Sequence, residues 1–374
     1  MKNTLICMLS VVMFWSMALA QTETEKSAIE KAKSFEDKED YGSALKWYQK
    51  ANKLNPKNGV IYYDIAWCQN ELELYDDVVE TATKGVSVSP SGKLYNEYGY
   101  ALYKLKNYPQ AIEKYKKALV LNPQESNAVK GLADSYFSNK DYDNALIYYK
   151  KCLEIGKEQK LANYKISWIM NDQKNYQKAV EYASAAIGID DKYAEAYNEL
   201  GYAYSQLDKK DLALENYKNA VEQDSVNATY NFNVADIYYA EGPLNDYDKA
   251  IDYYKKGIES DQKNAISYYR LGWILNDKEK YEEAQPYLYK AVEIDPKYSV
   301  AWLELGWIDF SNEKYSAAES KFIKAIQFDS KSELGRYYLG QVYIKQDKNS
   351  NAQKMVDELK GMSSKYADKL KAKM

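Results

Sequence analysis

Small and apolar residues recur in register along almost the whole of this 374-residue chain. Gly201, in the stretch ELGYAY, is followed twelve residues later by Ala213 and after seven more by Ala220. The same triplet of small residues returns every 33 or 34 residues, apart from one step of 37 residues that holds an insertion at Gly242-Pro243. Between them, Leu, Ile, Tyr and Phe follow the spacing of a helix face. The pattern predicts an all-α chain of about ten helical hairpins.

A single hairpin of this kind cannot bury its own apolar face, so the hairpins are expected to stack on one another as an α-solenoid. Small residues on two helix faces allow neighbouring helices to approach closely. Gly and Pro are expected to mark the joints between helices. Residues 362–374, which are rich in Lys, are expected to form a C-terminal capping helix over the last repeat.

The repeating unit resembles the tetratricopeptide repeat, a helix–turn–helix unit of about 34 residues. The Leu-Gly pair of that repeat stands at Leu200-Gly201, Leu271-Gly272, Leu305-Gly306 and Leu339-Gly340, and its closing Pro at Pro56, Pro90, Pro123 and Pro296. The resemblance implies a right-handed superhelix whose first helices line a concave surface. It also implies that protein or peptide partners bind there.

One phrase occurs three times, as YDIAWCQNE (63–71), YKISWIMND (164–172) and YRLGWILND (269–277). The three Trp residues are 101 and 105 residues apart, which is about three repeats. A second phrase follows the first each time, as YNEYGY, YNELGY and WLELGW. The sequence therefore predicts a leading repeat and then a three-repeat block used three times. The predicted boundaries are a leader at 1–20, the leading repeat at 21–58, blocks at 59–159, 160–262 and 263–361, and the cap at 362–374.

Helical offsets of 4, 7 and 8 residues place the Tyr, Trp, Asn and acidic residue of this phrase on one face. In the family that the repeat resembles, the Trp position usually points into the concave groove. The resulting candidate binding residues are Tyr63, Trp67, Asn70, Tyr100, Tyr164, Trp168, Asn171, Asp172, Tyr202, Tyr269, Trp273, Asn276 and Trp307.

Two interpretations of this stripe stay open. The rings either pack between successive first helices and stiffen the stack, or they contact a ligand. The Asn residues and their acidic neighbours have no expected use in a core, which favours binding. An aromatic ring beside amide and carboxylate groups can hold an extended peptide or a sugar by stacking and hydrogen bonds.

The composition narrows the function further. The chain contains no His, which removes the commonest general base and the commonest metal ligand. Cys68 and Cys152 are far apart in sequence and are expected to be buried, unpaired thiols. The net charge of −4 gives no electrostatic reason to bind nucleic acid. We therefore expect no enzymatic activity, no metal, no cofactor and no nucleic-acid partner.

The first twenty residues have the pattern of a secretory signal peptide. Lys2 precedes an apolar stretch from Leu5 to Met17, and Ala18-Leu19-Ala20 forms a cleavage site before Gln21. We expect export, to a bacterial periplasm or alternatively by secretion, with no membrane insertion after cleavage. The sequence thus predicts a non-enzymatic scaffold or adaptor of the cell envelope. The alternative is a glycan-binding module that uses the Trp, Tyr and Asn stripe, and the oligomeric state stays open.

Overall fold

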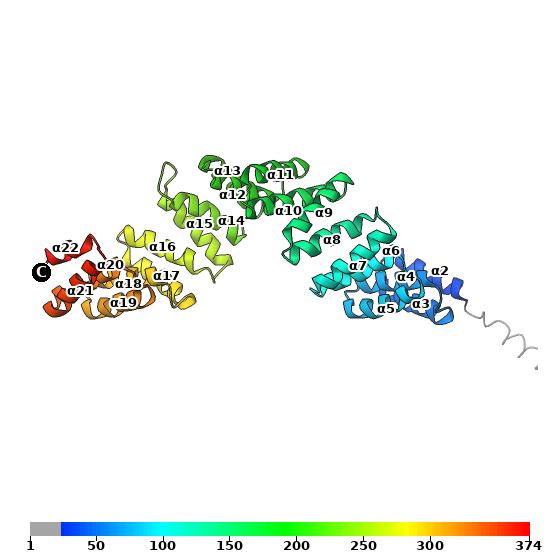
Figure 1. Ribbon diagram of the computed structural model, residues 1–374, viewed down its shortest axis with the longest axis horizontal. Coiled ribbons are helices and arrows are strands. Elements are labelled where there is room, and N and C mark those ends of the chain that lie inside the picture. The colour runs from blue at the N-terminus through cyan, green and yellow to red at the C-terminus, as the bar shows by residue number, and fades with distance from the viewer. Residues whose placement is uncertain (1–23) are drawn as a thin grey trace, which may run out of the picture. The chain divides into compact units, whose positions relative to one another are not determined.

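The computed structural model describes residues 24–374, and this part of the chain contains 21 α-helices and no strand (Figure 1). The predicted leader at residues 1–20 lies outside the described residues. No helix of the described part is long and apolar enough to cross a membrane. The all-α prediction is therefore confirmed for residues 24–374.

The helices follow one another as ten hairpins, each made of a first and a second helix. The hairpins are α2 (Glu25–Glu36) with α3 (Tyr41–Leu54), α4 (Gly59–Glu71) with α5 (Tyr75–Val88), α6 (Gly92–Lys104) with α7 (Tyr108–Leu121), α8 (Ser126–Ser138) with α9 (Tyr142–Glu154), α10 (Gln159–Asp172) with α11 (Tyr176–Ile189), α12 (Ala194–Gln206) with α13 (Lys210–Gln223), α14 (Ala228–Tyr239) with α15 (Tyr247–Ser260), α16 (Ala265–Asp277) with α17 (Tyr281–Ile294), α18 (Ser299–Ser311) with α19 (Tyr315–Phe328), and α20 (Glu333–Lys345) with α21 (Asn349–Gly361). The short helix α22 (Tyr366–Lys371) follows the tenth hairpin.

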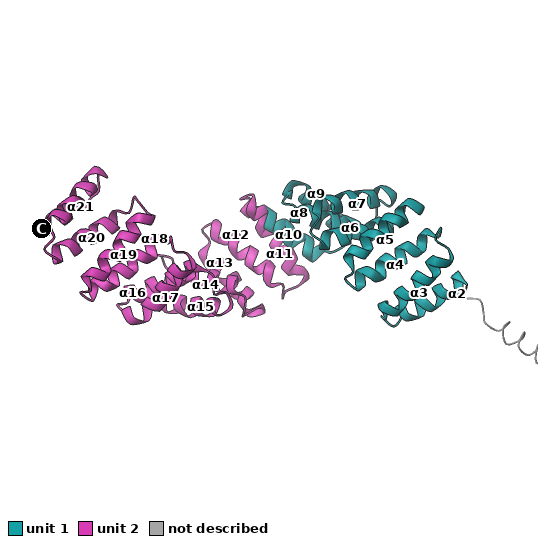
Figure 2. Ribbon diagram, turned by 90° about the horizontal axis from the view of Figure 1, so that it is seen from below, with its two compact units in different colours: residues 1–169 teal, residues 170–374 magenta. Residues whose placement is uncertain are grey.

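The chain divides into two compact units, residues 1–169 and residues 170–374, and the division falls within α10 (Figure 2). The predicted three-repeat blocks do not coincide with these units. Their boundaries at 159/160 and 262/263 fall near the start of α10 and between α15 and α16. Serial duplication of a block stays a prediction from the sequence.

Small residues let the two helices of a hairpin approach each other. A Cβ atom added at Gly201 of α12 would lie 2.7 Å from the ring of Tyr217 in α13, and one at Gly306 of α18 would lie 2.7 Å from the ring of Phe322 in α19. Both rings are buried. The glycine thus provides the space in which an aromatic ring from the second helix is buried.

Helix α22 covers the end of the second unit. Its Ala367 and Leu370 are buried, and they join a core cluster with Leu339 and Leu359 from the tenth hairpin. Leu370 lies over Gly340 of α20, the place that a second-helix side chain takes in other hairpins. The prediction of a capping helix is confirmed.

The turns inside the hairpins differ from the expectation that Gly and Pro mark the joints between helices. Nine of these turns in the described chain have a charged residue with positive φ, such as Glu73 (φ 58°) and Lys106 (φ 61°). Single charged residues can adopt this left-handed conformation at a modest cost when the chain on both sides is fixed. Gly is therefore not required there. Pro does stand where predicted, between the second helix of one repeat and the first helix of the next, as at Pro56 after α3.

The insertion at Gly242-Pro243 lies between α14 and α15. The Asn245 side chain donates hydrogen bonds to the backbone oxygens of Tyr238, Tyr239 and Ala240 at 3.2 to 3.4 Å. These are carbonyls that the end of a helix leaves without intrahelical partners. The inserted loop therefore closes the end of α14.

Cys68 and Cys152 are both buried and unpaired, as the sequence predicts. Burial raises the pKa of the Cys68 thiol to about 12 and that of the Cys152 thiol to about 11. Only the thiolate is nucleophilic, so these are structural residues of the packed helices.

The Gly257→Ala substitution tests the close helix approach. An added Cβ would overlap the ring of Phe232, which is buried in α14. We expect a loss of about 1–3 kcal/mol in the free energy of unfolding, measured by urea denaturation. The control is Gly188→Ala, because nothing lies within 4 Å of a Cβ at that position. It should leave stability unchanged or raise it by up to about 1 kcal/mol. Equal behaviour of the two variants would contradict the packing account.

Candidate functional site

The Trp residues of the repeated phrase pack against the repeat that precedes them. Each ring meets the Tyr that begins the preceding second helix: Tyr41 with Trp67 at 5.2 Å between ring centroids, Tyr142 with Trp168 at 5.2 Å, and Tyr247 with Trp273 at 5.9 Å. Trp168 and Trp273 also contact a ring at the end of the preceding first helix, Phe137 and Tyr239 respectively. All three Trp side chains are partly buried. The rings therefore link successive repeats, as the packing interpretation requires.

The two Tyr residues at the equivalent position are more open to solvent. Tyr100 contacts Tyr75 at 6.3 Å, and Tyr202 contacts Tyr176 at 6.4 Å. Their exposed fractions are 39% and 40%. Trp307 packs against Phe310 and Tyr338 and is partly buried. Rings of the predicted stripe thus combine packing with accessible surface.

The first Tyr of each phrase lies near the next repeat or beside a Lys. Lys93 of α6 lies over the ring of Tyr63, and Tyr269 packs edge-on against Tyr298 at 5.2 Å. Tyr164 has Lys165 over its ring at 5.0 Å. Burial raises the pKa of Tyr63 to about 12, so its hydroxyl stays protonated at neutral pH. These three residues are partly buried.

The Asn residues of the phrase are buried, contrary to the expectation that they have no use in a core. Their exposed fractions are only 5 to 6%. Each amide donates a hydrogen bond to a Glu carboxylate of the next first helix. The pairs are Asn70 with Glu97 at 2.8 Å, Asn171 with Glu199 at 2.8 Å, and Asn276 with Glu304. Buried polar groups are tolerated when they have partners, and these amides hold successive first helices together.

The three Glu residues were missed by the sequence analysis. They occupy one position in the second repeated phrase, two residues before its Gly, in YNEYGY, YNELGY and WLELGW. The sequence feature that could have identified them is a Glu that stands two residues before the core Gly in all three phrases. Its meaning needed the neighbouring helix, because the partner Asn lies 27 or 28 residues earlier in the chain.

The polar groups of these pairs are incompletely satisfied. The amide oxygens of Asn70, Asn171 and Asn276 are buried and have no hydrogen-bond partner in the described chain. Neither Glu97 nor Glu304 forms an ion pair with another described residue. Other acids on first helices, Asp134, Asp236 and Asp309, do form ion pairs. Burial raises the pKa of Glu97, and it raises that of Glu304 to about 7.

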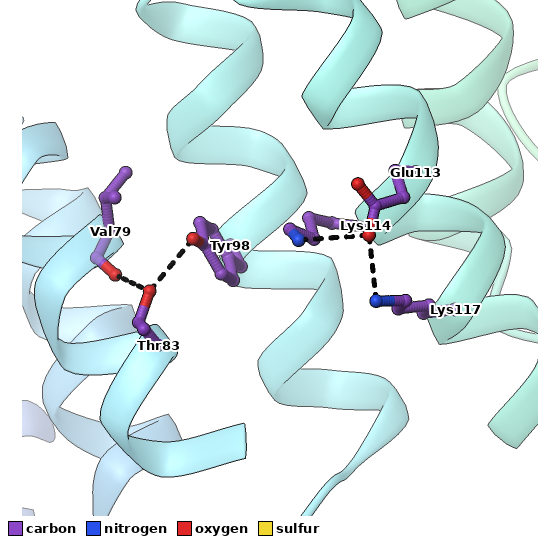
Figure 3. A network of polar contacts seen from close by, with 6 residues as sticks. All are labelled: Val79, Thr83, Tyr98, Glu113, Lys114 and Lys117. Atoms are coloured by element: carbon purple, nitrogen blue, oxygen red, sulfur yellow. Dashed lines mark hydrogen bonds and ion pairs between the residues drawn. The ribbon is translucent and has the colours of Figure 1, made fainter. Parts of the chain in front are cut away.

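Other acids of the chain have cations beside them. Glu113 of α7 contacts Lys114 at 3.2 Å and Lys117 at 2.8 Å, and these bonds lower its pKa (Figure 3). In the same view Thr83 of α5 bonds the Val79 carbonyl at 2.7 Å and the Tyr98 hydroxyl at 2.9 Å (Figure 3). On the first helices, Asp134 is paired with Lys130 at 3.1 Å, and Asp236 and Asp309 pair with Arg270 and Lys321.

A second carboxylate lies beside each Asn–Glu pair. The residue after Asn is acidic in every phrase and is exposed: Glu71, Asp172 and Asp277. We call the resulting groups the acidic aromatic sites. Site 1 is Asn70, Glu71, Glu97 and Tyr100; site 2 is Asn171, Asp172, Glu199 and Tyr202; site 3 is Asn276, Asp277, Glu304 and Trp307. Burial raises the pKa of Tyr202, and the neighbouring Tyr176, Glu199 and Asp172 add to this shift.

Two of these sites open into pockets. The pocket at site 1 has a volume of about 340 Å³ and extends from Trp67 past Tyr103 to Lys130 and Asp134. The pocket at site 3 has a volume of about 160 Å³ and is also lined by Trp273 and Tyr338. Aromatic rings and carboxylates line both pockets. No group of His, Cys, Asp and Glu able to hold a metal ion occurs in residues 24–374.

Family models of the tetratricopeptide repeat match residues 25–58, 97–159, 194–227, 228–264 and 265–298, together more than half of the chain. The matched ranges contain Leu200-Gly201 and Leu271-Gly272, and also Pro56, Pro123 and Pro296. The chain therefore belongs to the tetratricopeptide repeat family.

Curated relatives match parts of the chain. The small glutamine-rich tetratricopeptide repeat-containing protein 2 of Mycosarcoma maydis is 33% identical over 118 residues, which are 31% of this chain and 33% of that protein. The Hsp70-Hsp90 organising protein of Plasmodium falciparum is 31% identical over 112 residues, 27% of this chain and 20% of that protein. The similarity thus spans a third or less of these relatives. A solved tetratricopeptide repeat protein from Parabacteroides merdae is 17% identical, with a TM-score of 0.48 over 67% of this chain and 98% of that one.

The Glu304→Gln substitution tests the buried carboxylate. Between about pH 4.5 and pH 7 the folded chain keeps a proton on Glu304 that the unfolded chain has released. The free energy of unfolding therefore falls as the pH rises through this window. Gln keeps the acceptor for Asn276 and removes the charge.

We expect Glu304→Gln to be more stable than the natural chain at pH 8 by roughly 1–3 kcal/mol, with a much smaller difference at pH 4. Urea denaturation at both pH values measures this. Glu282→Gln, at an exposed position of α17, is the matched control and should show no such pH-dependent gain. The gain in stability of Glu304→Gln over the natural chain is compared at the two pH values. An equal gain at pH 8 and pH 4 would contradict a destabilising charge on Glu304.

Proposed function

We propose that this protein is a non-enzymatic interaction scaffold of the cell envelope, which binds a protein or an extended peptide along its first helices. Tetratricopeptide repeats generally bind protein or peptide partners, and the family membership supports that part of the proposal. One relative is named as an organising protein for Hsp70 and Hsp90. The observation that carries the proposal is the set of accessible rings and exposed carboxylates on the first helices, namely Tyr100, Tyr202, Glu71, Asp172 and Asp277.

The same rings supported a glycan-binding module as the alternative. A sugar would need polar groups beside the rings, and the amide nitrogens of Asn70, Asn171 and Asn276 already donate to Glu carboxylates. Buried amides cannot change partner at low cost. The geometry therefore favours a polypeptide partner over a glycan.

The location in the envelope rests on the leader alone. An apolar stretch followed by Ala18-Leu19-Ala20 supports export with cleavage before Gln21. Mass spectrometry of protein purified from its natural host should find a mature N-terminus at Gln21 or its cyclised form. A mature chain that begins at Met1 would refute export by this route.

Peptide selection on the purified protein tests the binding function. A random peptide library should yield binders, and Tyr100→Ala and Tyr202→Ala should each weaken their binding by about 1–3 kcal/mol, because these rings are accessible anchors. Unfolding midpoints should change little. Tyr289→Ala on α17 is the control, since Tyr289 is 45% exposed on a second helix. Failure to enrich any peptide, or equal losses in all three variants, would contradict binding along the first helices.

A further inference from the structure

We propose that the three acidic aromatic sites each receive a Lys or Arg side chain from an extended, basic partner polypeptide. This inference rests on the proposed function and names the chemistry of the partner. In each site a buried Asn donates a hydrogen bond to a Glu of the next first helix, an exposed acid follows the Asn, and an aromatic residue stands three positions after the Glu.

The first argument is the missing counter-charge. Glu97 and Glu304 are partly buried, and each receives hydrogen bonds only from amides, with no cation from the described chain. By contrast, Asp309 is buried and has Lys321 as its partner. A carboxylate taken out of water is stabilised most by a cation that hydrogen-bonds to it. Sites 1 and 3 provide the carboxylate without the cation.

The second argument is the set of groups around that carboxylate. The exposed acids Glu71 and Asp277 add a second negative charge at the mouth of sites 1 and 3. Rings flank it, Tyr100 in site 1 and Trp307 in site 3. A ring face and a carboxylate together attract an ammonium or guanidinium group. A sugar could donate hydroxyl hydrogen bonds to these carboxylates but brings no counter-charge, and an acidic peptide would be repelled by them.

The third argument is the unpartnered amide oxygen. Each Asn is about nine-tenths or more buried, and within the described chain its amide oxygen receives no hydrogen bond. Lys has three N–H donors and Arg has five, and neither has an acceptor. A ligand side chain composed only of N–H donors can therefore supply the donor that these three amide oxygens lack.

Cations of the protein occupy the edges of site 1. Lys104 lies over the rings of Tyr75 and Tyr100 at 5.7 Å, and Lys130 lines the pocket but is paired with Asp134. Neither forms an ion pair with Glu97. Lys104 and Lys130 restrict where a ligand cation can enter site 1. Because neither is paired with Glu97, they do not neutralise its carboxylate.

The repeat sets the spacing of the sites within the second unit. Site 2 uses α10 and α12, and site 3 uses α16 and α18, which is a displacement of three first helices. Helices packed roughly 10 Å apart place the two sites on the order of 30 Å from each other. An extended chain covers this distance in about nine residues. A partner with basic residues about nine positions apart can therefore reach both sites.

The experiment uses fluorescein-labelled Gly/Ser peptides with two Arg residues about nine positions apart. The control peptide has citrulline, which is neutral and of the same shape, at those positions. The site variant combines Glu97→Gln, Glu199→Gln and Glu304→Gln. The control variant combines Asp76→Asn, Glu181→Gln and Glu282→Gln, which removes three exposed carboxylates from second helices. Fluorescence anisotropy at low salt measures the affinities.

We expect the Arg peptide to bind the natural chain and the control variant with similar affinity, and the site variant roughly tenfold more weakly. The citrulline peptide should bind weakly to all three. Urea denaturation should show that the site variant is folded and no less stable than the natural chain at pH 8.

Equal weakening by the two variants would show that only the net charge matters and would overturn the proposal, as would equal binding of the citrulline peptide. Selected peptides that lack basic residues, yet lose affinity in Tyr100→Ala and Tyr202→Ala, would also overturn it and would leave the scaffold function intact. A library that yields no binders would refute the proposed scaffold function itself. Failure of the basic-partner proposal and failure of the scaffold function can therefore be told apart.

Discussion

The close approach of two helices at a small residue is the contact on which the rest of this structure depends. Gly201 and Gly306 leave room for buried rings from the partner helix, and Gly340 leaves the same room for Leu370 of the capping helix. Close packing of this kind fixes the position and the rotation of each first helix within its hairpin. Because successive first helices are fixed, side chains far apart in sequence meet at constant geometry. The Asn–Glu pairs are a consequence of this packing.

The Asn–Glu pairs combine a structural contact with an unfavourable charge. The hydrogen bond from the Asn276 amide to Glu304 links α16 to α18, yet the carboxylate is partly buried and forms no ion pair within the described chain. We expect a neutral side chain to form the same link at a lower cost in stability. Groups whose pKa values are strongly shifted by burial often mark sites of function. The Asn–Glu hydrogen bond occurs three times in the described chain, which agrees with the proposed use of the charge.

Aromatic rings carry the contacts between one repeat and the next. Tyr begins most of the second helices, and five of these Tyr residues contact the Trp or Tyr of the following first helix. This arrangement accounts for part of the high Tyr content of the chain. A Tyr or Trp ring can be packed on one side and accessible on the other. The packing and binding interpretations of the stripe therefore apply to different faces of the same rings.

The sequence by itself determined the helices, the ten hairpins, the capping helix and the burial of the two cysteines. These features follow from the spacing of small and apolar residues, which acts over one helix or one repeat. The sequence pattern also located the repeated phrase, but it predicted that Asn70, Asn171 and Asn276 would lie on an open surface. Only the tertiary structure decided their burial, because the partner carboxylates Glu97, Glu199 and Glu304 belong to the next first helix. Periodicity identifies the face of a helix, whereas the partner of a polar group on that face depends on how neighbouring helices are packed together.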